Sequence, residues 1–126
     1  MPVDEVVKAY TQAWLELNDD ARRQLLAQAW ADDGIYTDPL RHLEGRDALN
    51  QAIAGFQQGR PGERIVLTSN IDCHHNMVRF AWRWYGADDS NIMDGIDFGE
   101  LASDGRLRRI VGFFGSLNEL MPGGGE

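Results

Sequence analysis

The chain has 126 residues, of which 43% are hydrophobic and 25% are charged, and its formal net charge is -8. This composition is typical of one globular domain with a single core, and it excludes a chain that is mainly disordered. The acidic balance also disfavours nucleic acid as a partner, because phosphate backbones bind clustered Lys and Arg.

The first part of the chain is predicted to form two helices. Asn18, Asp19 and Asp20 break the first helix and cap a second one, which reads ARRQLLAQAW and ends near Trp30. The first helix is predicted from apolar residues spaced by four and three, which make one helical stripe: Val3, Val7, Tyr10, Trp14 and Leu17.

A short strand from about Ile35 to Thr37 is predicted next, and it stops at Pro39. A loop through His42 then leads into a third helix over residues 46–56, where apolar residues again keep helical spacing. Glycines and a proline end this helix before residue 63.

The remainder is predicted to form four long strands, within ERIVLTSNID, HNMVRFAWRWY, NIMDGIDFGELA and RLRRIVGFFG. Their links, HHN, GADDSN and ASDG, are short enough for antiparallel hairpins. Helices followed by an antiparallel sheet give an α+β layout. We therefore expect one domain over residues 1–120 and a disordered tail over residues 121–126.

Strand alternation predicts which side chains face the helices. The aromatic face of the second long strand must point at them, and in the last strand Ile110, Gly112 and Phe114 share one face. The opposite face of the sheet carries apolar side chains among charged ones, including Phe98 and Phe113, and no further helix is available to cover it. We therefore expect a homodimer through the outer sheet face.

Asp97, in GIDFG, lies in the middle of a predicted strand and shares its face with Gly95 and Gly99. Two glycines beside an acid leave open space, which is what a ligand pocket needs. The alternative is an acid at the margin of the sheet, either wetted or paired with arginine. This stretch by itself leaves both interpretations open.

Three segments in order, AWADDGIYTDP, EGRDAL and GIDFGELASDGRLRRIVGFFG, resemble the nuclear transport factor two-like superfamily, which includes SnoaL-like proteins and ketosteroid isomerases. The resemblance covers nearly the whole chain. It implies a cone-shaped curved antiparallel sheet packed against three N-terminal helices, with a ligand pocket at the open end. Many members are homodimers.

The resemblance also implies site residues. Asp38 falls where ketosteroid isomerases keep a general base, and Asp97 falls where they keep a protonated acid that donates to the substrate oxyanion. Trp14 occupies the position of the catalytic tyrosine, and its indole can donate a hydrogen bond but cannot pass a proton. Tyr36 or Tyr10 could supply a hydroxyl instead. The other residues implied to bind substrate are Val78, Phe80, Trp82, Trp84, Ile110 and Phe114.

Two other chemistries of the superfamily fit the sequence less well. Epoxide hydrolysis needs an arginine in the pocket, whereas Arg79 and Arg83 fall on the opposite face of their strand. Scytalone-type dehydration uses pocket histidines, and His74 with its neighbour is predicted at the surface end of a hairpin. His42, on a loop that we expect at the rim of the cone, is the better candidate for a substrate contact.

Cofactor and membrane motifs are not found in the sequence. It contains no GxGxxG, P-loop, Gly-x-Ser-x-Gly or HExxH pattern, so we expect neither a nucleotide cofactor nor a metal site. The single Cys73 is interpreted as a small buried residue. No apolar run is long enough to span a bilayer and the first residues are acidic, so we expect a cytoplasmic protein with no membrane partner.

Two functions follow as hypotheses. The leading one is a small-molecule-binding enzyme, an isomerase or a lyase or cyclase, in which Asp38 moves a proton on an apolar substrate. The alternative is a non-catalytic ligand-binding or protein-interaction module with the same fold. The leading hypothesis predicts that burial raises the pKa of Asp97 above its free value of about 3.9, while Asp38 stays ionised.

Overall fold

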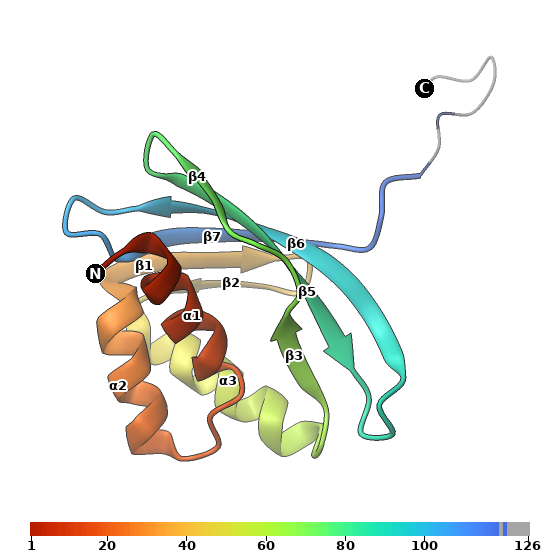
Figure 1. Ribbon diagram of the computed structural model, residues 1–126. Coiled ribbons are helices and arrows are strands. Elements are labelled where there is room, and N and C mark those ends of the chain that lie inside the picture. The colour runs from red at the N-terminus through yellow and green to blue at the C-terminus, as the bar shows by residue number, and fades with distance from the viewer. Residues whose placement is uncertain (119, 121–126) are drawn as a thin grey trace.

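The computed structural model describes residues 1–118 and 120, and the tail for which disorder is predicted, residues 121–126, lies outside them. In the described part of the chain, three helices lie on one side of a curved sheet of seven strands (Figure 1). The helices are α1 (Val3–Ala13), α2 (Asp19–Ala29) and α3 (Arg46–Gly59). The strands are β1 (Trp30–Asp38), β2 (Arg41–Glu44), β3 (Arg64–Leu67), β4 (Asp72–His74), β5 (Met77–Tyr85), β6 (Asn91–Leu101) and β7 (Leu107–Phe114).

The sheet follows the order β2-β1-β7-β6-β5-β3, and β4 pairs with β5 beside this path. The three predicted hairpins, β4–β5, β5–β6 and β6–β7, are confirmed as antiparallel pairs. β1 runs parallel to β7, so the sheet is mixed where the sequence predicted an antiparallel one. Local periodicity could not predict this pair, because its two strands lie far apart in the sequence.

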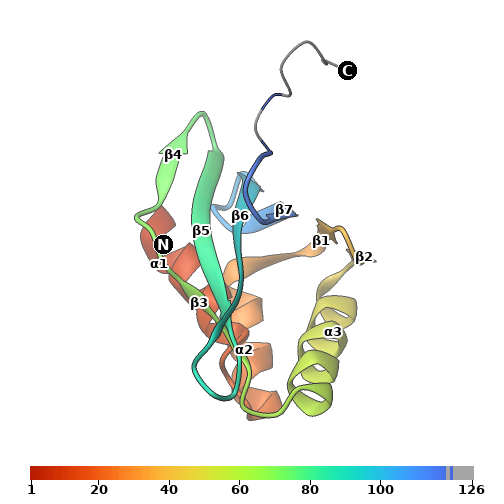
Figure 2. The same cartoon turned by 90° about the vertical axis from the view of Figure 1, so that its right-hand side faces the viewer.

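The predicted α+β cone is confirmed. The long strands β5 and β6 bend as they run, so that the sheet curls around the helices (Figure 1). From the side, α3 lies across from the ends of β5 and β6, while α1 and α2 lie behind these strands (Figure 2). The helices and the inner sheet face bury a shared apolar core that includes Val7, Leu26 and Ile53.

Four predicted boundaries are wrong. The first helix ends at Ala13, so Leu17, predicted on its apolar stripe, lies in the α1–α2 connection and is 78% exposed. β1 begins at Trp30 and not near Ile35. Its register with β7 shifts between Trp30 and Ile35, and this irregularity interrupts the alternation from which a strand is predicted. The predicted strand ERIVLTSNID is two strands, because Ser69 Oγ accepts the N–H of Ala81 at 2.7 Å between them. The predicted loop around His42 is strand β2, which pairs with β1.

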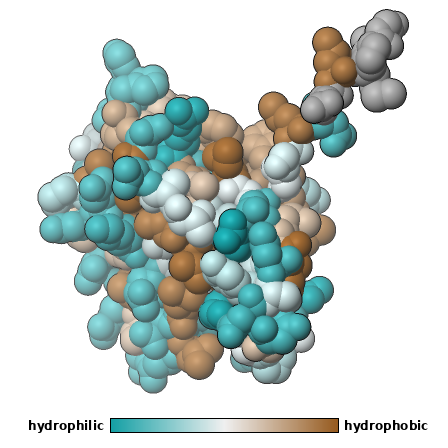
Figure 3. Space-filling model, turned by 45° about the vertical axis from the view of Figure 1, so that its right-hand side comes forward, coloured by the Kyte–Doolittle hydropathy of each residue, from teal (hydrophilic) through white to brown (hydrophobic). Residues whose placement is uncertain are grey.

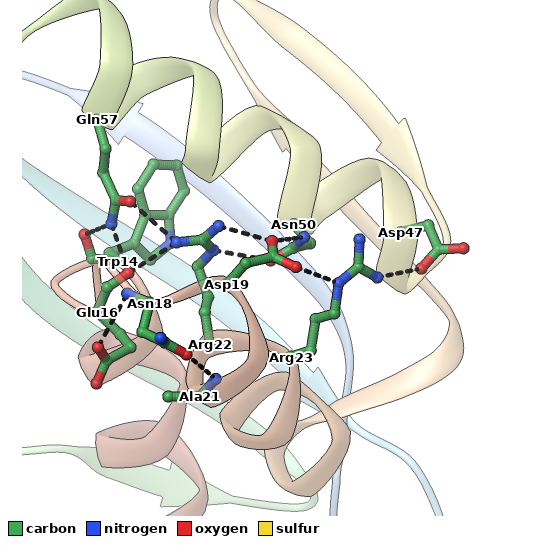
Figure 4. Close-up of polar contacts among 10 residues, drawn as sticks. All are labelled: Trp14, Glu16, Asn18, Asp19, Ala21, Arg22, Arg23, Asp47, Asn50 and Gln57. Carbon is green, nitrogen blue, oxygen red and sulfur yellow. Dashed lines mark hydrogen bonds and ion pairs between the residues drawn. The ribbon is translucent and has the colours of Figure 1, made fainter.

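Asn18 caps α2, as predicted, by accepting the N–H of Ala21 at 2.9 Å. One turn later, α2 carries a buried charge: Arg22 is only 2% exposed. Its guanidinium donates four hydrogen bonds, to groups on the α1–α2 connection, α2 and α3 (Figure 4). The acceptors are Asn50 Oδ1 at 2.8 Å, the Glu16 carbonyl at 2.8 Å, Gln57 Oε1 at 3.0 Å and Asp19 Oδ1 at 3.0 Å. Because a buried arginine is stable only when its donors are satisfied, this network joins the α1–α2 connection to α3.

Apolar side chains also remain on the surface. On the face drawn in Figure 3, they gather in a band between hydrophilic patches. On the outer sheet face, Ile96 and Phe98 are each 42% exposed and Phe113 is 57% exposed, as the alternation predicts. The rings of Phe98 and Phe113 pack edge to face at 6.0 Å. Cys73, interpreted as a buried residue, is exposed on the short strand β4.

The described residues contain no helix that is long and apolar enough to cross a membrane.

Candidate active site

A cavity of about 210 Å³ lies between the inner face of the sheet and helices α1 and α3. The predicted site residues that line it are Trp14, Tyr36, Asp38, Phe80, Trp82, Trp84, Asp97 and Phe114. The remaining lining residues are Tyr10, Thr11, Leu40, Arg41, Phe56, Arg60, Ile65 and Leu67. The walls are therefore largely aromatic and aliphatic, with two carboxyl groups among them.

The two carboxyl groups approach each other across Gly112. Gly112 on β7 pairs in register with Asp97 on β6, and the parallel pairing of Thr37 with Val111 puts Asp38 on its other side. A Cβ atom at residue 112 would lie 2.8 Å from Asp97 Oδ1 and 3.5 Å from the Cβ of Asp38. The absence of a side chain at Gly112 therefore leaves room for the Asp97 carboxyl group next to Asp38. Gly112 was not predicted as a site residue, although its place on the inward face of β7 was a signal.

Asp97 is buried, with 6% of its surface exposed, and accepts one hydrogen bond, from Trp82 Nε1 at 3.0 Å. Burial raises the pKa of Asp97 to about 7, against the lowering effect of the Trp82 N–H and with a further contribution from the negative charge of Asp38. The direction agrees with the sequence-based expectation. Near neutral pH, a large fraction of Asp97 is therefore a neutral acid that can donate a hydrogen bond.

The space next to Asp97 is not where the sequence analysis expected it. A Cβ atom at Gly95 would lie 2.0 Å from the indole of Trp82, and one at Gly99 would lie 2.8 Å from Ile110 Cδ1. Side chains of the neighbouring strands thus fill the room above both glycines. Gly95 lets the Trp82 indole lie over β6 and reach Asp97, and the Asp97 carboxyl group itself lies over Gly112.

Asp38 ends β1 and is 9% exposed. Its Oδ1 accepts the backbone N–H groups of Leu40 at 2.8 Å and Arg41 at 3.0 Å, which closes the turn into β2. Its Oδ2 accepts the hydroxyl of Tyr36 at 2.6 Å. The carboxyl group of Asp38 therefore accepts three hydrogen bonds, against one for that of Asp97. Asp38 and Asp97 thus lie in one cavity but in different electrostatic environments.

Two tyrosines, Tyr10 and Tyr36, line the cavity together with the two acids. Burial raises the pKa of Tyr36 and of Tyr10 well above the ordinary value, and the charge of Asp97 raises both further. Each therefore keeps its proton. The Tyr36 hydroxyl donates its hydrogen bond to Asp38, while the Tyr10 ring stacks on Trp30 with 5.6 Å between ring centroids.

Trp14, at the position of the expected tyrosine, is part of the cavity wall. Its ring packs against Tyr36 at 6.0 Å and edge to face against Phe56 at 5.9 Å. Its carbonyl accepts the side-chain amide of Gln57 at 3.1 Å, so the Arg22 network also holds this wall (Figure 4).

Three predicted substrate contacts do not line the cavity. Val78 and Ile110 belong to the apolar core beneath it. His42 is exposed, and its Nδ1 hydrogen-bonds Thr37 Oγ1 at 2.8 Å. Because β2 is a strand and not a loop, its side chains alternate, and Arg41 lines the cavity in place of His42.

Arg41 and Arg60 are lining residues that the sequence analysis missed. Arg41 could have been found only by recognising β2, and Arg60 lies just after the last turn of α3. Within the described residues, no group of three or more His, Cys, Asp or Glu side chains is arranged to hold a metal ion.

No protein-family model matches the sequence, and no curated protein matches it. Among solved structures, a protein of the SnoaL-like family from Agrobacterium tumefaciens str. C58 is 36% identical in sequence, with a TM-score of 0.82. That alignment covers 88% of this chain and 95% of the other.

Two further structures share the fold at low sequence identity. A SnoaL-like protein from Jannaschia sp. CCS1 is 16% identical, with a TM-score of 0.67 and coverage of 90% and 88% of the two chains. A protein with a cystatin-like fold from Methylobium petroleophilum PM1 is 13% identical, with a TM-score of 0.75 and coverage of 93% and 78%.

Proposed function

The chain belongs to the SnoaL-like family, and from this membership we propose that it is an enzyme that moves a proton on a small cyclic substrate. The observation that carries the proposal is the pair of acids in one cavity: Asp38 with three donors on its carboxylate, and Asp97 with a pKa of about 7. Two carboxyl groups with different environments divide naturally into a base and a hydrogen-bond donor. The Agrobacterium relative is described as a candidate isomerase and the Jannaschia protein as a candidate polyketide cyclase.

In the proposed reaction, Asp38 removes a proton from a carbon next to a substrate carbonyl. The electron pair of the broken C–H bond moves onto the carbonyl oxygen, where protonated Asp97 donates a hydrogen bond to the developing enolate. Trp82 holds Asp97 Oδ1, which leaves Oδ2 to carry the proton. Asp38 then returns the proton to another carbon, as in an isomerisation. In a cyclisation, the enolate carbon would instead attack a second carbonyl carbon of the same substrate, whose π electrons move to its oxygen and take the proton back from Asp38.

The cavity favours a compact substrate. Its volume of about 210 Å³ lies below the roughly 300 Å³ at which pockets for drug-sized ligands begin. One or two rings therefore suit it better than the four rings of a steroid. The ring system would lie between the Trp82 and Phe114 side of the wall and the Trp14 and Phe56 side.

The test uses 2-tetralone, a two-ring ketone with acidic protons beside its carbonyl. In D₂O, the wild-type protein should replace the C1 protons by deuterium, and NMR should show their loss faster than in buffer. Asp38→Asn should slow the exchange by about a hundredfold or more. Asp97→Asn should lower it less, because an amide still donates a hydrogen bond.

The matched control is Asp72→Asn, because this exposed carboxylate pairs with Arg79 outside the cavity. It should exchange 2-tetralone at the wild-type rate. Exchange no faster than in buffer, or an Asp38→Asn rate equal to the wild-type rate, would reject the enzyme proposal.

A non-catalytic ligand-binding module remains the second candidate, and two observations favour it. Asp97 already accepts a hydrogen bond from Trp82, and Trp14 stands where ketosteroid isomerases keep a catalytic tyrosine. Binding of 2-tetralone, measured by tryptophan fluorescence, without any exchange of its protons would select this alternative.

We also propose that the protein forms a homodimer through the outer sheet face. Phe98 and Phe113 pack together there, and a groove runs past them to the exposed Leu117. Phe113→Asp should shift the mass measured by light scattering toward the monomer, whereas Leu17→Asp, an exposed site on the other side of the molecule, should not. A monomer mass for the wild-type protein at micromolar concentration would contradict the dimer.

A further inference from the structure

Two arginines lie at the mouth of the cavity and have no part in the proposed proton transfer. Arg41 comes from β2, and Arg60 follows the last turn of α3. Both line the cavity, and both also line a groove that continues along α3 past Gly55 and Pro61. They therefore mark the place where the cavity opens to the surface.

Arg41 lies near Asp38 but does not donate a hydrogen bond to it. Its Nε lies 4.0 Å from Asp38 Oδ1, too far for a hydrogen bond, and no described residue accepts a hydrogen bond from its guanidinium. Asp38 takes its hydrogen bonds from Tyr36 and from backbone N–H groups instead. The side chain of Arg41 is 29% exposed and lines the cavity. Its guanidinium donors are therefore available to a ligand there.

Arg60 is fixed in a different way. Its guanidinium carbon lies 5.0 Å from the centroid of the Trp84 ring, and its Nη1 lies 3.4 Å from Glu63 Oε1. The same Glu63 oxygen accepts Trp84 Nε1 at 2.8 Å. An arginine that lies on an aromatic ring loses little further freedom when its edge binds a planar anion.

We propose that the ligand of this cavity is a compact cyclic acid, with its rings among the aromatic walls and its carboxylate between Arg41 and Arg60. Guanidinium groups bind carboxylates through paired N–H donors, and two of them on separate elements would fix the orientation of the ring. The carboxylate end would then lie at the mouth, and the reacting end would lie against Asp38 and Asp97. This inference rests on the proposed function for the cavity itself, but it concerns recognition and not proton transfer.

The charges at the mouth permit such a ligand. Asp38 and Glu63 are the acids that face the two arginines, at 4.0 and 3.4 Å. Neither pair is a close bidentate contact, and Asp97 is neutral in a large fraction of molecules near pH 7. An added carboxylate therefore meets two cations whose donors are only partly used.

The experiment compares 6-hydroxy-2-naphthoic acid with its methyl ester, which has nearly the same shape but no charge. Titration calorimetry at neutral pH should show that the acid binds the wild-type protein about tenfold more tightly, as a charge-assisted hydrogen bond commonly provides. Arg41→Gln and Arg60→Gln should each remove most of this preference and leave the affinity for the ester unchanged. Arg79→Gln, on the outer face of β5, is the control and should change neither affinity.

The proposal is wrong if the acid and the ester bind equally well, if the two arginine variants weaken both compounds alike, or if neither compound binds. Its failure is separable from that of the enzyme proposal, because binding needs no proton transfer. Asp38→Asn should retain the preference for the acid even though it loses exchange of 2-tetralone. Exchange without a preference for the acid would reject only the anionic ligand, and a preference for the acid without exchange would reject only the catalysis.

Discussion

Among the residues that the structure describes, charged or ionisable groups are buried in two places, one on each side of Trp14. On one side, Arg22 is almost completely enclosed and donates four hydrogen bonds to protein acceptors. On the other side, Asp97 is similarly enclosed but has one protein donor and borders a cavity. Trp14 joins the two, because its carbonyl belongs to the first network and its ring lines the second site.

The difference shows that burial alone does not mark a functional group. Protein acceptors replace the water that the Arg22 guanidinium has lost, and the resulting hydrogen bonds join α2 to α3. Asp97 has only the Trp82 N–H as a protein donor, and burial raises its pKa to about 7. An incompletely satisfied acid beside an empty space is the arrangement that a ligand can complete.

The largest effect that we expect is a pH dependence of stability due to Asp97. Its pKa is about 7 in the folded protein and about 3.9 when unfolded, so the folded protein binds the proton more tightly. The stabilisation is full below about pH 4 and is lost as the pH rises through 7, a change of about 4 kcal/mol in the free energy of unfolding. Asp97→Asn should lack this component, and urea denaturation of both proteins from pH 4.5 to pH 8 measures the difference. Parallel pH profiles for the two proteins would show that Asp97 has an ordinary pKa.

The second effect should appear in the Arg22 network. Arg22→Met leaves the side chains of Asn50 and Gln57 without their donor and should lower the free energy of unfolding by about 3 kcal/mol. Arg23→Met is the matched control, because the Arg23 guanidinium pairs with Asp19 and Asp47 at the surface (Figure 4). This substitution should change the free energy of unfolding little. Urea denaturation at one pH is the measurement. Equal losses in the two variants would mean that enclosure gives Arg22 no special role.

The smallest effect should follow from displacing the Asp97 carboxyl group with a side chain at residue 112. The methyl group of Gly112→Ala would lie 2.8 Å from Asp97 Oδ1 and must displace this carboxyl group from the Trp82 N–H. The affinity for 2-naphthol, a planar analogue of the enol of 2-tetralone, should fall by about tenfold, since small displacements in a site are costly. Gly55→Ala, where an added Cβ meets no atom within 4 Å, should bind 2-naphthol like the wild-type protein. Unchanged affinity in Gly112→Ala would show that the ligand does not depend on the position of the Asp97 carboxyl group.

Much of this architecture is determined by local sequence. The helical stripe of α1 and the alternation in β5, β6 and β7 predict which side chains face the core, and the structure has Phe80 and Trp82 inside with Phe98 and Phe113 outside. These predictions succeed because a strand turns successive side chains to opposite faces, whatever its partners are. The raised pKa of Asp97 follows from the same local parity, which puts an acid on a buried face.

The geometry of the candidate site was decided by tertiary structure. The parallel pairing of β1 with β7 brings Asp38 next to Gly112, the formation of β2 turns Arg41 inward and His42 outward, and Trp82 fills the space over Gly95 from the neighbouring strand. Each of these facts depends on which strands pair and in which register. Pairing between distant segments is set by the packing of the whole core, so a local pattern that fixes the face of a side chain does not fix its neighbours.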